Sequence, residues 1–553
     1  MGAPRAERLG LLADIARRRT FAIISHPDAG KTTLTEKLLL FAGAVREAGA
    51  VRARRGARAT TSDWMEFERR RGISISSTVL QFEYDGAVCN LLDTPGHADF
   101  GEDTYRTLCA ADAAIMLLDM AKGLEPQTLK LFRICRTRQL PLITFVNKLD
   151  RPALPALGLL DQVAARLGIA PVPVTWPVGD GHQFAGVIDR QRREFVRVER
   201  TTHGSTAGAE RRYPVAAAVP PGVAREHWRA ALEELELLDA STERLDHARF
   251  LAGRQTPVFF GSALANVGVQ RTLEGLIELA PSPAPFAVEG DGELRPLDAA
   301  FSAFVFKIQA NMNPRHRDRV AFLRVCSGSV ERGLSTTVAR TGRSLQLRFL
   351  QRAFGQERAT IERAVAGDVV AVTNARGLRI GDTLYSGDRV AFPALPSFAP
   401  ERFATARNSD LARDKQFRRG LAELAAQGVV QILLRPEIGT REPILAAVGE
   451  LQFEVAAFRM TREFGCPIEL TPAPWKRACR VERGHMAKLQ GKWGIELVED
   501  ARGNPVALFL SERLMKTTAE EVPEIRLPRP ADHEGAYPRD LYGCSSEPGA
   551  ASS

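Results

Sequence analysis

The chain has 553 residues, of which 44% are hydrophobic and 25% charged, and these proportions exclude a wholly disordered chain, a collagen-like fibre and other low-complexity structure. At roughly 100–200 residues per domain, a chain of this length is expected to form three or four domains. The net charge of +9 reflects 75 lysines and arginines against 66 aspartates and glutamates, an excess that favours a polyanionic partner such as RNA and is equally well explained by solubility alone.

The first part of the chain alternates short apolar runs with stretches of helical periodicity. The run Phe21–Ile24 predicts a buried strand, which is followed by a loop and then by an amphipathic helix. Further strands are expected at Val88–Leu92, Ala113–Leu118, Leu142–Val146 and Pro257–Phe260. Continuous apolar runs separated by helices indicate a mostly parallel sheet that is covered on both faces. We therefore predict an α/β domain over residues 1–290, with a subdomain inserted at about 151–250.

The pattern changes after the proline-rich linker Pro281–Pro285. Short strands then alternate with glycine turns, one of which, at Ser327–Gly328, predicts a hairpin. These strands predict a β-barrel domain over residues 291–395. A helix, two strands and another helix follow, and they predict an α+β domain of ferredoxin-like type over residues 396–520. Residues 521–553 carry Pro, Gly, Ser and mixed charge, which predicts a disordered tail.

The cysteines and the apolar runs indicate the compartment. Seven cysteines are scattered singly, and none has the spacing of a zinc ligand set. An odd, dispersed set fits reduced thiols better than a disulfide framework. No apolar run approaches the ~18–20 residues that a membrane span needs, and the N-terminus lacks the apolar region of a secretory signal. We expect a cytoplasmic monomer that binds neither membrane nor DNA.

The loop after the first strand has the spacing of a phosphate-binding loop, with a serine in place of the first glycine. It consists of Ser25, His26, Pro27, Asp28, Ala29, Gly30, Lys31 and Thr32. Backbone N–H groups in such a loop, together with the N-terminus of the next helix, cradle a polyphosphate. Gly30 allows close approach, Lys31 reaches the β- and γ-phosphates, and the Thr32 hydroxyl ligates Mg²⁺. Ser25 suits this position only if the backbone there is open to a residue other than glycine.

Three further motifs follow predicted strands. The first is Asp93, Thr94, Pro95, Gly96 and His97; the second is Asn147, Lys148, Leu149 and Asp150; the third is Ser262 and Ala263. The carboxylate of Asp93 can hold Mg²⁺ through water, and Gly96 can offer its N–H group to a γ-phosphate. Asp150 can accept two hydrogen bonds from guanine that adenine does not offer, so discrimination can reach roughly 10⁴–10⁵. Backbone N–H groups near Ser262 would donate to guanine O6.

Each of the three later motifs is weak evidence when it is taken alone, because turns of similar composition are common, whereas the phosphate-loop spacing is moderately specific by itself. All four occur in a fixed order, and each follows a predicted strand. Open α/β sheets bind ligands at the carboxyl ends of their strands. The set therefore predicts a site for GTP or GDP with Mg²⁺.

Several segments resemble a known family. Arg71–Ile75 and Asp93–His97 are similar to the switch segments of translational GTPases. A narrower resemblance, to the bacterial class II peptide-chain release factors known as release factor three, runs from about residue 10 to about residue 515. It is carried by Ser25–Thr33, Ser62–Glu66, Phe304–Met312 and His316–Val320.

The resemblance implies roles for individual residues. Ser74 falls where the family ligates Mg²⁺ when GTP is bound, so that the implied metal ligands are Thr32, Ser74 and Asp93. His97 falls where the family positions the attacking water, a role that does not require a strong base. The resemblance also implies a ribosome-stimulated GTPase that contacts ribosomal RNA and proteins. Such a GTPase releases and recycles class I release factors after the peptide has left, and it is not itself codon-specific.

Two other functions remain open at this point. A translocase like elongation factor G, or a ribosome-protection protein, would share the first half of the chain, although both are longer. A regulatory protein that binds GTP without hydrolysing it would use the nucleotide as a latch, and the serine at position 25 motivates this alternative. The chain contains no Gly-Gly-Gln tripeptide, so we do not expect it to hydrolyse peptidyl-tRNA itself.

Overall fold

The computed structural model describes residues 5–45, 67–68, 74–199, 206, 208–216, 218–290, 292–310, 319–354, 357–373, 375, 377–395 and 398–522. Several sequence predictions fall outside these residues: the resemblance at Ser62–Glu66, Arg71–Ile73, Asn311–Met312 and His316–Asp318, and the tail from residue 523 onward. In the described part, no helix combines the length and the apolar character that crossing a membrane requires.

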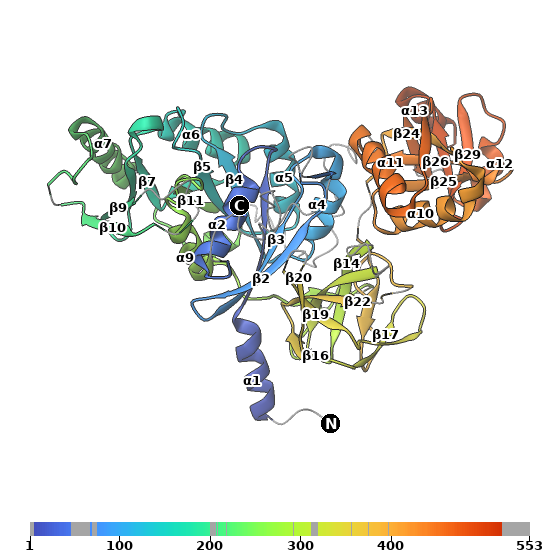
Figure 1. Cartoon of the computed structure of the whole chain (residues 1–553), viewed down its shortest axis with the longest axis horizontal. Coiled ribbons are helices and arrows are strands. Elements are labelled where there is room, and N and C mark those ends of the chain that lie inside the picture. The colour runs from blue at the N-terminus through green and yellow to red at the C-terminus, as the bar shows by residue number, and fades with distance from the viewer. Residues whose placement is uncertain are drawn as a thin grey trace, which may run out of the picture.

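The first domain is built on a seven-stranded part of a larger sheet, with helices on both faces (Figure 1). Its strand order is β6 (Ala170–Pro173), β11 (Gln255–Phe260), β5 (Leu142–Asn147), β4 (Ala113–Asp119), β1 (Arg18–Ser25), β3 (Ala87–Asp93) and β2 (Thr78–Tyr84). Every neighbouring pair is parallel except β2 with β3, which is antiparallel. The predicted mostly parallel sheet is therefore confirmed.

Alternate residues of the central strands face the two helical layers. Phe21 and Ile23 of β1 pack in one buried cluster with α2 (Lys31–Phe41) and α9 (Val269–Leu279). Ala22 and Ile24 pack in a second cluster on the opposite face. The helices of that face are α4 (Gly101–Leu108), α5 (Pro126–Thr137) and α6 (Ala156–Leu167). This period of two is the reason why a strand covered on both faces reads as a continuous apolar run.

The inserted subdomain is a separate antiparallel sheet covered by one long helix. Its strands are β7 (Thr175–Val178), β8 (Gly186–Asp189), β9 (Glu194–Val198) and β10 (Glu210–Pro214), and the helix is α7 (Arg225–Ser241). Trp228 of α7 packs edge-on against Phe195 of β9, with ring centroids 5.4 Å apart. The insertion begins later than the predicted residue 151, because α6 and β6 still belong to the main domain. Two prolines in β6, at the sheet edge, hide this strand from sequence patterns.

The second domain is a curled, antiparallel, barrel-like sheet, as predicted. Its strands are β14 (Ser302–Ala310), β15 (Arg319–Ser327), β17 (Ser335–Val338), β18 (Ser344–Gln346), β19 (Leu350–Phe354), β20 (Glu357–Thr360), β22 (Val369–Thr373) and β23 (Thr383–Tyr385), with the separate pair β16 (Ser329–Glu331) and β21 (Arg363–Val365). The sheet joins that of the first domain where Phe354 of β19 pairs with Leu80 of β2.

The predicted hairpin at Ser327–Gly328 is wrong. Strand β15 pairs with β14 and β22, whereas β16 pairs with β21. Gly328 has φ +66°, and a Cβ there would lie 2.5 Å from the Ala299 carbonyl oxygen. The glycine therefore turns the chain from one sheet into the next rather than back along the same sheet.

The third domain begins with a ferredoxin-like β-α-β-β-α-β unit. This unit comprises β24 (Arg402–Asn408), α10 (Asp414–Ala426), β25 (Gln431–Arg435), β26 (Gly439–Ala447), α11 (Glu450–Phe464) and β27 (Ile468–Pro472), in strand order β27-β24-β26-β25. The sheet then continues through β29 (Ile495–Asp500), β30 (Pro505–Phe509) and β28 (Arg477–Arg480), with α12 (Met486–Leu489) and α13 (Glu512–Glu521) beside them. The sequence predicts the first unit, but it does not predict this extension.

Candidate nucleotide-binding site

The parallel sheet brings the motifs to one edge. Ser25 is the last residue of β1, Asp93 the last of β3 and Asn147 the last of β5, while Ser262 comes two residues after β11 ends. Because these strands are parallel, their carboxyl ends meet on the same side of the sheet. The spacing in sequence thus becomes a single cluster in space.

The backbone of the phosphate loop explains its residue types. Ser25 ends a strand and does not have a positive φ, so the absence of the first glycine places no strain there. Its hydroxyl is buried and has no hydrogen-bond partner among the described residues. Gly30 has φ +96° at the start of α2, and a Cβ there would lie 2.5 Å from Nδ2 of Asn147. Asp28 has φ +66°, so it also shapes the loop through its backbone.

The Asp93 segment lies against this loop. The Lys31 ammonium donates to Oδ1 of Asp93 at 2.5 Å, and both side chains are buried. The Thr94 hydroxyl donates to the Ile23 carbonyl at 2.6 Å, and the Pro95 carbonyl accepts from Thr104. A Cβ on Gly96 would lie 3.5 Å from the Pro27 backbone. The phosphate loop and the segment that follows β3 are therefore in direct contact.

Asn147 joins the phosphate loop to the loop after β11. Its amide nitrogen donates to the Ala29 carbonyl at 2.9 Å, and its amide oxygen accepts from the Ala263 N–H group at 2.8 Å. Leu149, two residues later, is buried, and its N–H group donates to the Gly261 carbonyl at 3.3 Å. One polar side chain and one short turn thus hold three of the motifs together.

Lys148 lies across the loop and contacts a residue that the sequence analysis did not identify. Its ammonium donates to Oδ2 of Asp119 at 2.8 Å and to the Asp28 carbonyl. Burial raises the pKa of Asp119, but the hydrogen bonds from Lys148 and from the Ala121 N–H group outweigh it and lower the pKa. Asp119 is the last residue of β4, and a carboxylate at the end of a predicted strand is the sequence feature that could have identified it.

Asp150 is held by the loop after β11. The Ser262 hydroxyl donates to Oδ1 of Asp150 at 2.5 Å and accepts from the Ala265 N–H group at 3.1 Å. The N–H groups of Gly261, Ser262 and Ala263 all donate within the protein, to Val146, Val267 and Asn147 respectively. These three amides are therefore already engaged within the protein, which does not support the predicted donation from them to guanine O6.

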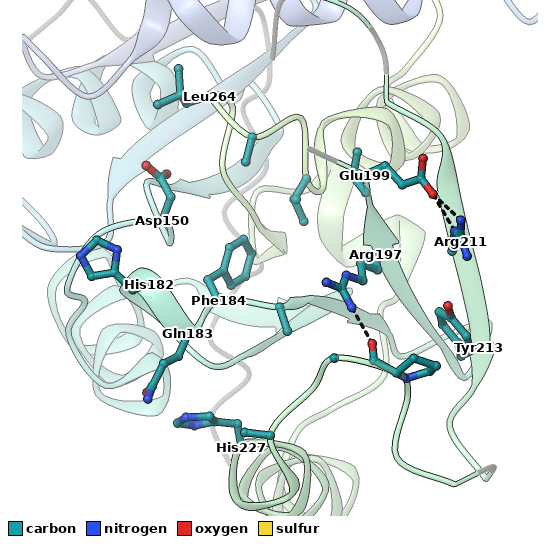
Figure 2. Close-up of a pocket in the computed structure, with 18 residues that line it drawn as sticks. Asp150, His182, Gln183, Phe184, Arg197, Glu199, Arg211, Tyr213, His227 and Leu264 are labelled. Atoms are coloured by element: carbon teal, nitrogen blue, oxygen red, sulfur yellow. Dashed lines mark hydrogen bonds and ion pairs between the residues drawn. The ribbon is translucent and has the colours of Figure 1, made fainter. Parts of the chain in front are cut away.

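A cavity of about 960 Å³ opens beside Asp150. Its lining residues extend from Asp150 toward the inserted subdomain (Figure 2). Its far wall is polar: Arg197 donates to the Pro221 carbonyl, and Arg211 pairs with Glu199 at 2.5 Å. The insertion therefore forms the wall of the cavity that lies across from Asp150.

Three family models match consecutive parts of the chain. The elongation factor Tu GTP binding domain matches residues 16–282, elongation factor G domain 2 matches residues 300–387, and the C-terminal domain of class II release factor RF3 matches residues 392–519. Peptide chain release factor 3 of Symbiobacterium thermophilum is 49% identical over 516 residues, which cover 93% of this chain and 97% of that protein. The chain belongs to the peptide chain release factor 3 family.

Other similarities agree with this family. Peptide chain release factor 3 of a Cyanothece species is 47% identical over 523 residues, which cover 94% of this chain and 96% of that protein. The crystal structure of a Thermus thermophilus protein, ttk003000868, superposes with a TM-score of 0.65 at 25% identity, and the match covers 88% of this chain and 71% of that one. The chain is thus a guanine-nucleotide-binding translational GTPase of termination.

His26 of the phosphate loop and Ser74, the implied metal ligand, are both at least half-buried. His26 is buried, with Nε2 2.5 Å from Oε2 of Glu125, and burial lowers the pKa of His26 although Glu125 opposes the shift. Ser74 is half-buried. The next two residues donate their N–H groups to Oε1 of Glu68, at 2.9 and 3.1 Å. Thr32 lies in the first turn of α2.

His97 directly precedes a short 3-10 turn, η1 (Ala98–Phe100), and caps it. Its Nδ1 accepts from the Asp99 N–H group at 3.2 Å. A backbone N–H group can only donate, so while Nδ1 accepts from it the proton of a neutral imidazole lies on Nε2. Oδ1 of Asp99 also lies 3.4 Å from Nδ1. The His97 side chain is 38% exposed. His97 is therefore a fixed hydrogen-bond donor at the end of the Asp93 segment.

The third domain holds the residues that follow His97. The Leu451 N–H group, in the first turn of α11, donates to Oδ2 of Asp99 at 2.9 Å. The residue before α11 is Gly449, which has no side chain to cap the helix, so Asp99 acts as the cap from another domain. A Cβ on Gly449 would lie 1.9 Å from the Asp99 carboxyl carbon.

An apolar cluster reinforces this contact. Phe67, Ile75 and Phe100 of the first domain pack there against Val455 of α11. The Phe67 and Phe458 rings meet edge-on at 5.2 Å. Ile75, at the end of one segment that resembles a switch, and Asp99 and Phe100, just after the other, therefore reach the third domain.

Proposed function

We propose that this chain is a ribosome-stimulated GTPase that promotes the release and recycling of class I peptide-chain release factors after peptide release. The observation that carries the proposal is the cluster of the phosphate loop and the Asp93 and Asn147 motifs, which hydrogen bonds join at one edge of the sheet. The match of residues 392–519 to the C-terminal domain of class II release factor RF3 supports the same function. The proposed setting is the cytoplasm, where the chain acts as a monomer on ribosomal RNA and proteins.

Nucleotide recognition is divided between the two sides of the cluster. The N–H groups of the phosphate loop and the Lys31 ammonium hold the phosphates. Asp150, with one oxygen fixed by Ser262, accepts from the guanine edge. Adenine would leave this carboxylate without donors, and a pocket left unpaired in this way discriminates by roughly 10⁴–10⁵.

The residues near the phosphates suit Mg²⁺, because they offer hydroxyl and carboxylate oxygens, the ligands this ion prefers. Thr32, Ser74 and Asp93 would hold it, Asp93 through water. When bound, the ion supplies positive charge that neutralises the β- and γ-phosphate oxygens. The contact between Lys31 and Asp93 supports this assignment, since it brings the carboxylate to the phosphate loop.

In the proposed reaction, His97 positions the attacking water. Its Nε2–H group donates to the water oxygen, while the Asp99 N–H group fixes the ring from the other side. Phosphoryl transfer relies mainly on positioning and charge stabilisation, so a neutral imidazole is sufficient. The proposal therefore assigns His97 an orienting role rather than that of a strong base.

The decisive experiment measures GTP turnover with and without ribosomes, and the dissociation of a labelled class I factor from termination complexes. We expect ribosomes to accelerate turnover, GTP to accelerate dissociation of the factor more than GDP does, and ATP not to compete. The His97→Ala variant should lose on the order of 10²-fold or more in turnover while it keeps its affinity for GDP. Turnover that is indifferent to ribosomes, or a factor that stays bound, would contradict the proposal.

A further inference from the structure

A lysine of the second domain reaches into the first domain and is buried there. Lys307, in β14, is 4% exposed. Its ammonium donates to the Ser76 hydroxyl at 2.6 Å, to the Ser77 hydroxyl at 3.1 Å and to the Ser77 carbonyl. An ammonium has three N–H donors, and each of them has an acceptor here.

Ser77 lies at the centre of a network that joins three segments. Its N–H group and its hydroxyl both donate to Oδ2 of Asp103 in α4, each at 2.8 Å. The Thr107 hydroxyl donates to the Ser77 hydroxyl at 2.8 Å. Oδ2 of Asp103 lies 3.8 Å from the Lys307 ammonium, so this carboxylate balances the buried charge. Lys307 thus ties β14 both to Ser77 and to the helix that follows His97.

The residues that Lys307 holds lie between two predicted metal ligands. Ser74 is two residues before Ser76. Strand β2 begins directly after Ser77, and its first residue, Thr78, pairs with Asp93. Lys307 therefore fixes the point where the Ser74 segment joins the strand beside Asp93.

Attachment of the two domains does not depend on this lysine. Arg324, on the neighbouring strand β15, donates to both carboxylate oxygens of Asp112, at 2.8 and 2.7 Å. Asp112 directly precedes β4, at the opposite end of that strand from Asp119 and the nucleotide motifs. Moving a cation out of water is costly, and well-packed apolar side chains often join domains as well as a buried ion pair does. A charged side chain at position 307 is explained better by the polar segment that it holds.

We propose that Lys307 is a positioning residue of the GTP-bound state, which holds Ser76 and Ser77 so that the Ser74 hydroxyl is kept ready for the metal and the γ-phosphate. The second domain is thereby coupled to the presence of the γ-phosphate. This inference rests on the proposed function and adds a residue from outside the first domain to its site. Coupling is reciprocal, so GTP must strengthen the contact of Lys307 with Ser76 and Ser77 as much as that contact strengthens GTP binding.

The test compares Lys307→Met with Arg324→Met, which breaks another interdomain contact made by a buried cation. Dissociation constants are measured for GDP and for a non-hydrolysable GTP analogue, with Mg²⁺, at a temperature where both variants are folded by circular dichroism. Coupling free energies between sites correspond to roughly 5–150-fold in affinity, and we expect Lys307→Met to weaken the analogue by about 10-fold. Affinity for GDP should stay near that of the unmodified chain, Lys307→Arg should recover part of the loss, and Arg324→Met should keep the original ratio.

Hydrogen exchange supplies a second readout that does not depend on turnover. The amides of β14 should exchange more slowly with the GTP analogue than with GDP, and this difference should vanish in Lys307→Met. If Lys307→Met does not fold, Ser76→Ala, which removes a single acceptor, should show a smaller loss in the same direction.

An unchanged ratio of analogue to GDP affinity in the folded variants would overturn the inference, as would an equal loss of that ratio in Arg324→Met. A chain that binds neither nucleotide before any substitution would instead refute the proposed function, so the two failures are distinguishable.

Discussion

Replacing Arg324 by methionine should strongly destabilise the junction of the first and second domains. The Arg324 side chain is fully buried and contacts both oxygens of Asp112 and the Gly367 carbonyl, the latter at 2.7 Å. Methionine has a similar volume, so the main effect is a buried carboxylate without its partner. Removing one member of a buried pair costs about 3–5 kcal/mol.

The cost can be expressed as a melting temperature. In a domain of 150–250 residues, 1 kcal/mol corresponds to about 2–4 °C, so the melting temperature should fall by roughly 6–20 °C. The double variant Arg324→Met with Asp112→Leu should recover most of this loss, because it removes both charges. Arg229→Met serves as the control, since Arg229 and Glu233 form an exposed helical pair worth about 0.3–0.5 kcal/mol.

The same variant should have a characteristic pH dependence. Burial raises the pKa of Asp112, and Arg324 opposes the shift, so its removal raises that pKa further. When folding raises the pKa of a carboxyl group, its ionised form destabilises the folded state. This destabilisation disappears when the pH is low enough to protonate the group in both the folded and the unfolded chain. The deficit of Arg324→Met should therefore shrink as the pH falls through this raised pKa toward the ordinary value of about 3.9.

Calorimetry at several pH values tests the whole argument. A fall in melting temperature of less than about 3 °C at neutral pH would mean that the pair is worth under 2 kcal/mol, and it would refute the argument. So would a double variant no more stable than Arg324→Met alone, or a deficit that grows as the pH is lowered.

Three other substitutions test the nucleotide site. Asp150→Asn should weaken GTP by on the order of 10²-fold or more, and should improve binding of xanthosine triphosphate, which presents an acceptor where guanine presents a donor; competition binding measures both. Asp99→Ala removes a helix cap worth about 1 kcal/mol and should lower kcat more than it raises KM. Asp99→Asn can still cap the helix, so it should keep kcat near that of the unmodified chain. Ser511→Ala, which removes the cap of α13, should change neither kcat nor KM. Gly30→Ala places a Cβ 2.5 Å from the Asn147 amide at φ +96°, so calorimetric titration should detect little GDP binding, and binding as tight as in the unmodified chain would contradict the role given to the loop.

The sequence predicts that the four motifs gather at one edge of the sheet, because each motif is local and follows a strand. Ser25, Asp93 and Asn147 are each the last residue of their strands, and the parallel sheet then aligns them without further information. The division into three domains can also be predicted from the sequence, because the spacing of apolar residues changes between them and is likewise a local property. Which of these residues bind the nucleotide and catalyse its hydrolysis stays a prediction of the sequence and of the proposal above.

The failures come from contacts that are not local. The hairpin at Ser327–Gly328 has the right composition, but the partner of each strand lies far away in the sequence. Nothing near position 307 indicates that Lys307 meets Ser76, and nothing near position 99 indicates that Asp99 meets α11. Such pairs depend on how whole domains pack, which periodicity cannot report.

The close approach of Gly449 to Asp99 has a consequence for motion. Asp99 packs so closely against Gly449 that no methyl group would fit between them. A small rotation of the third domain would therefore lengthen the hydrogen bond between Asp99 and Leu451 and expose the end of α11. We therefore expect the third domain to be either seated or detached, with few intermediate positions. On detachment, the turn that carries His97 would lose its external anchor in a single step.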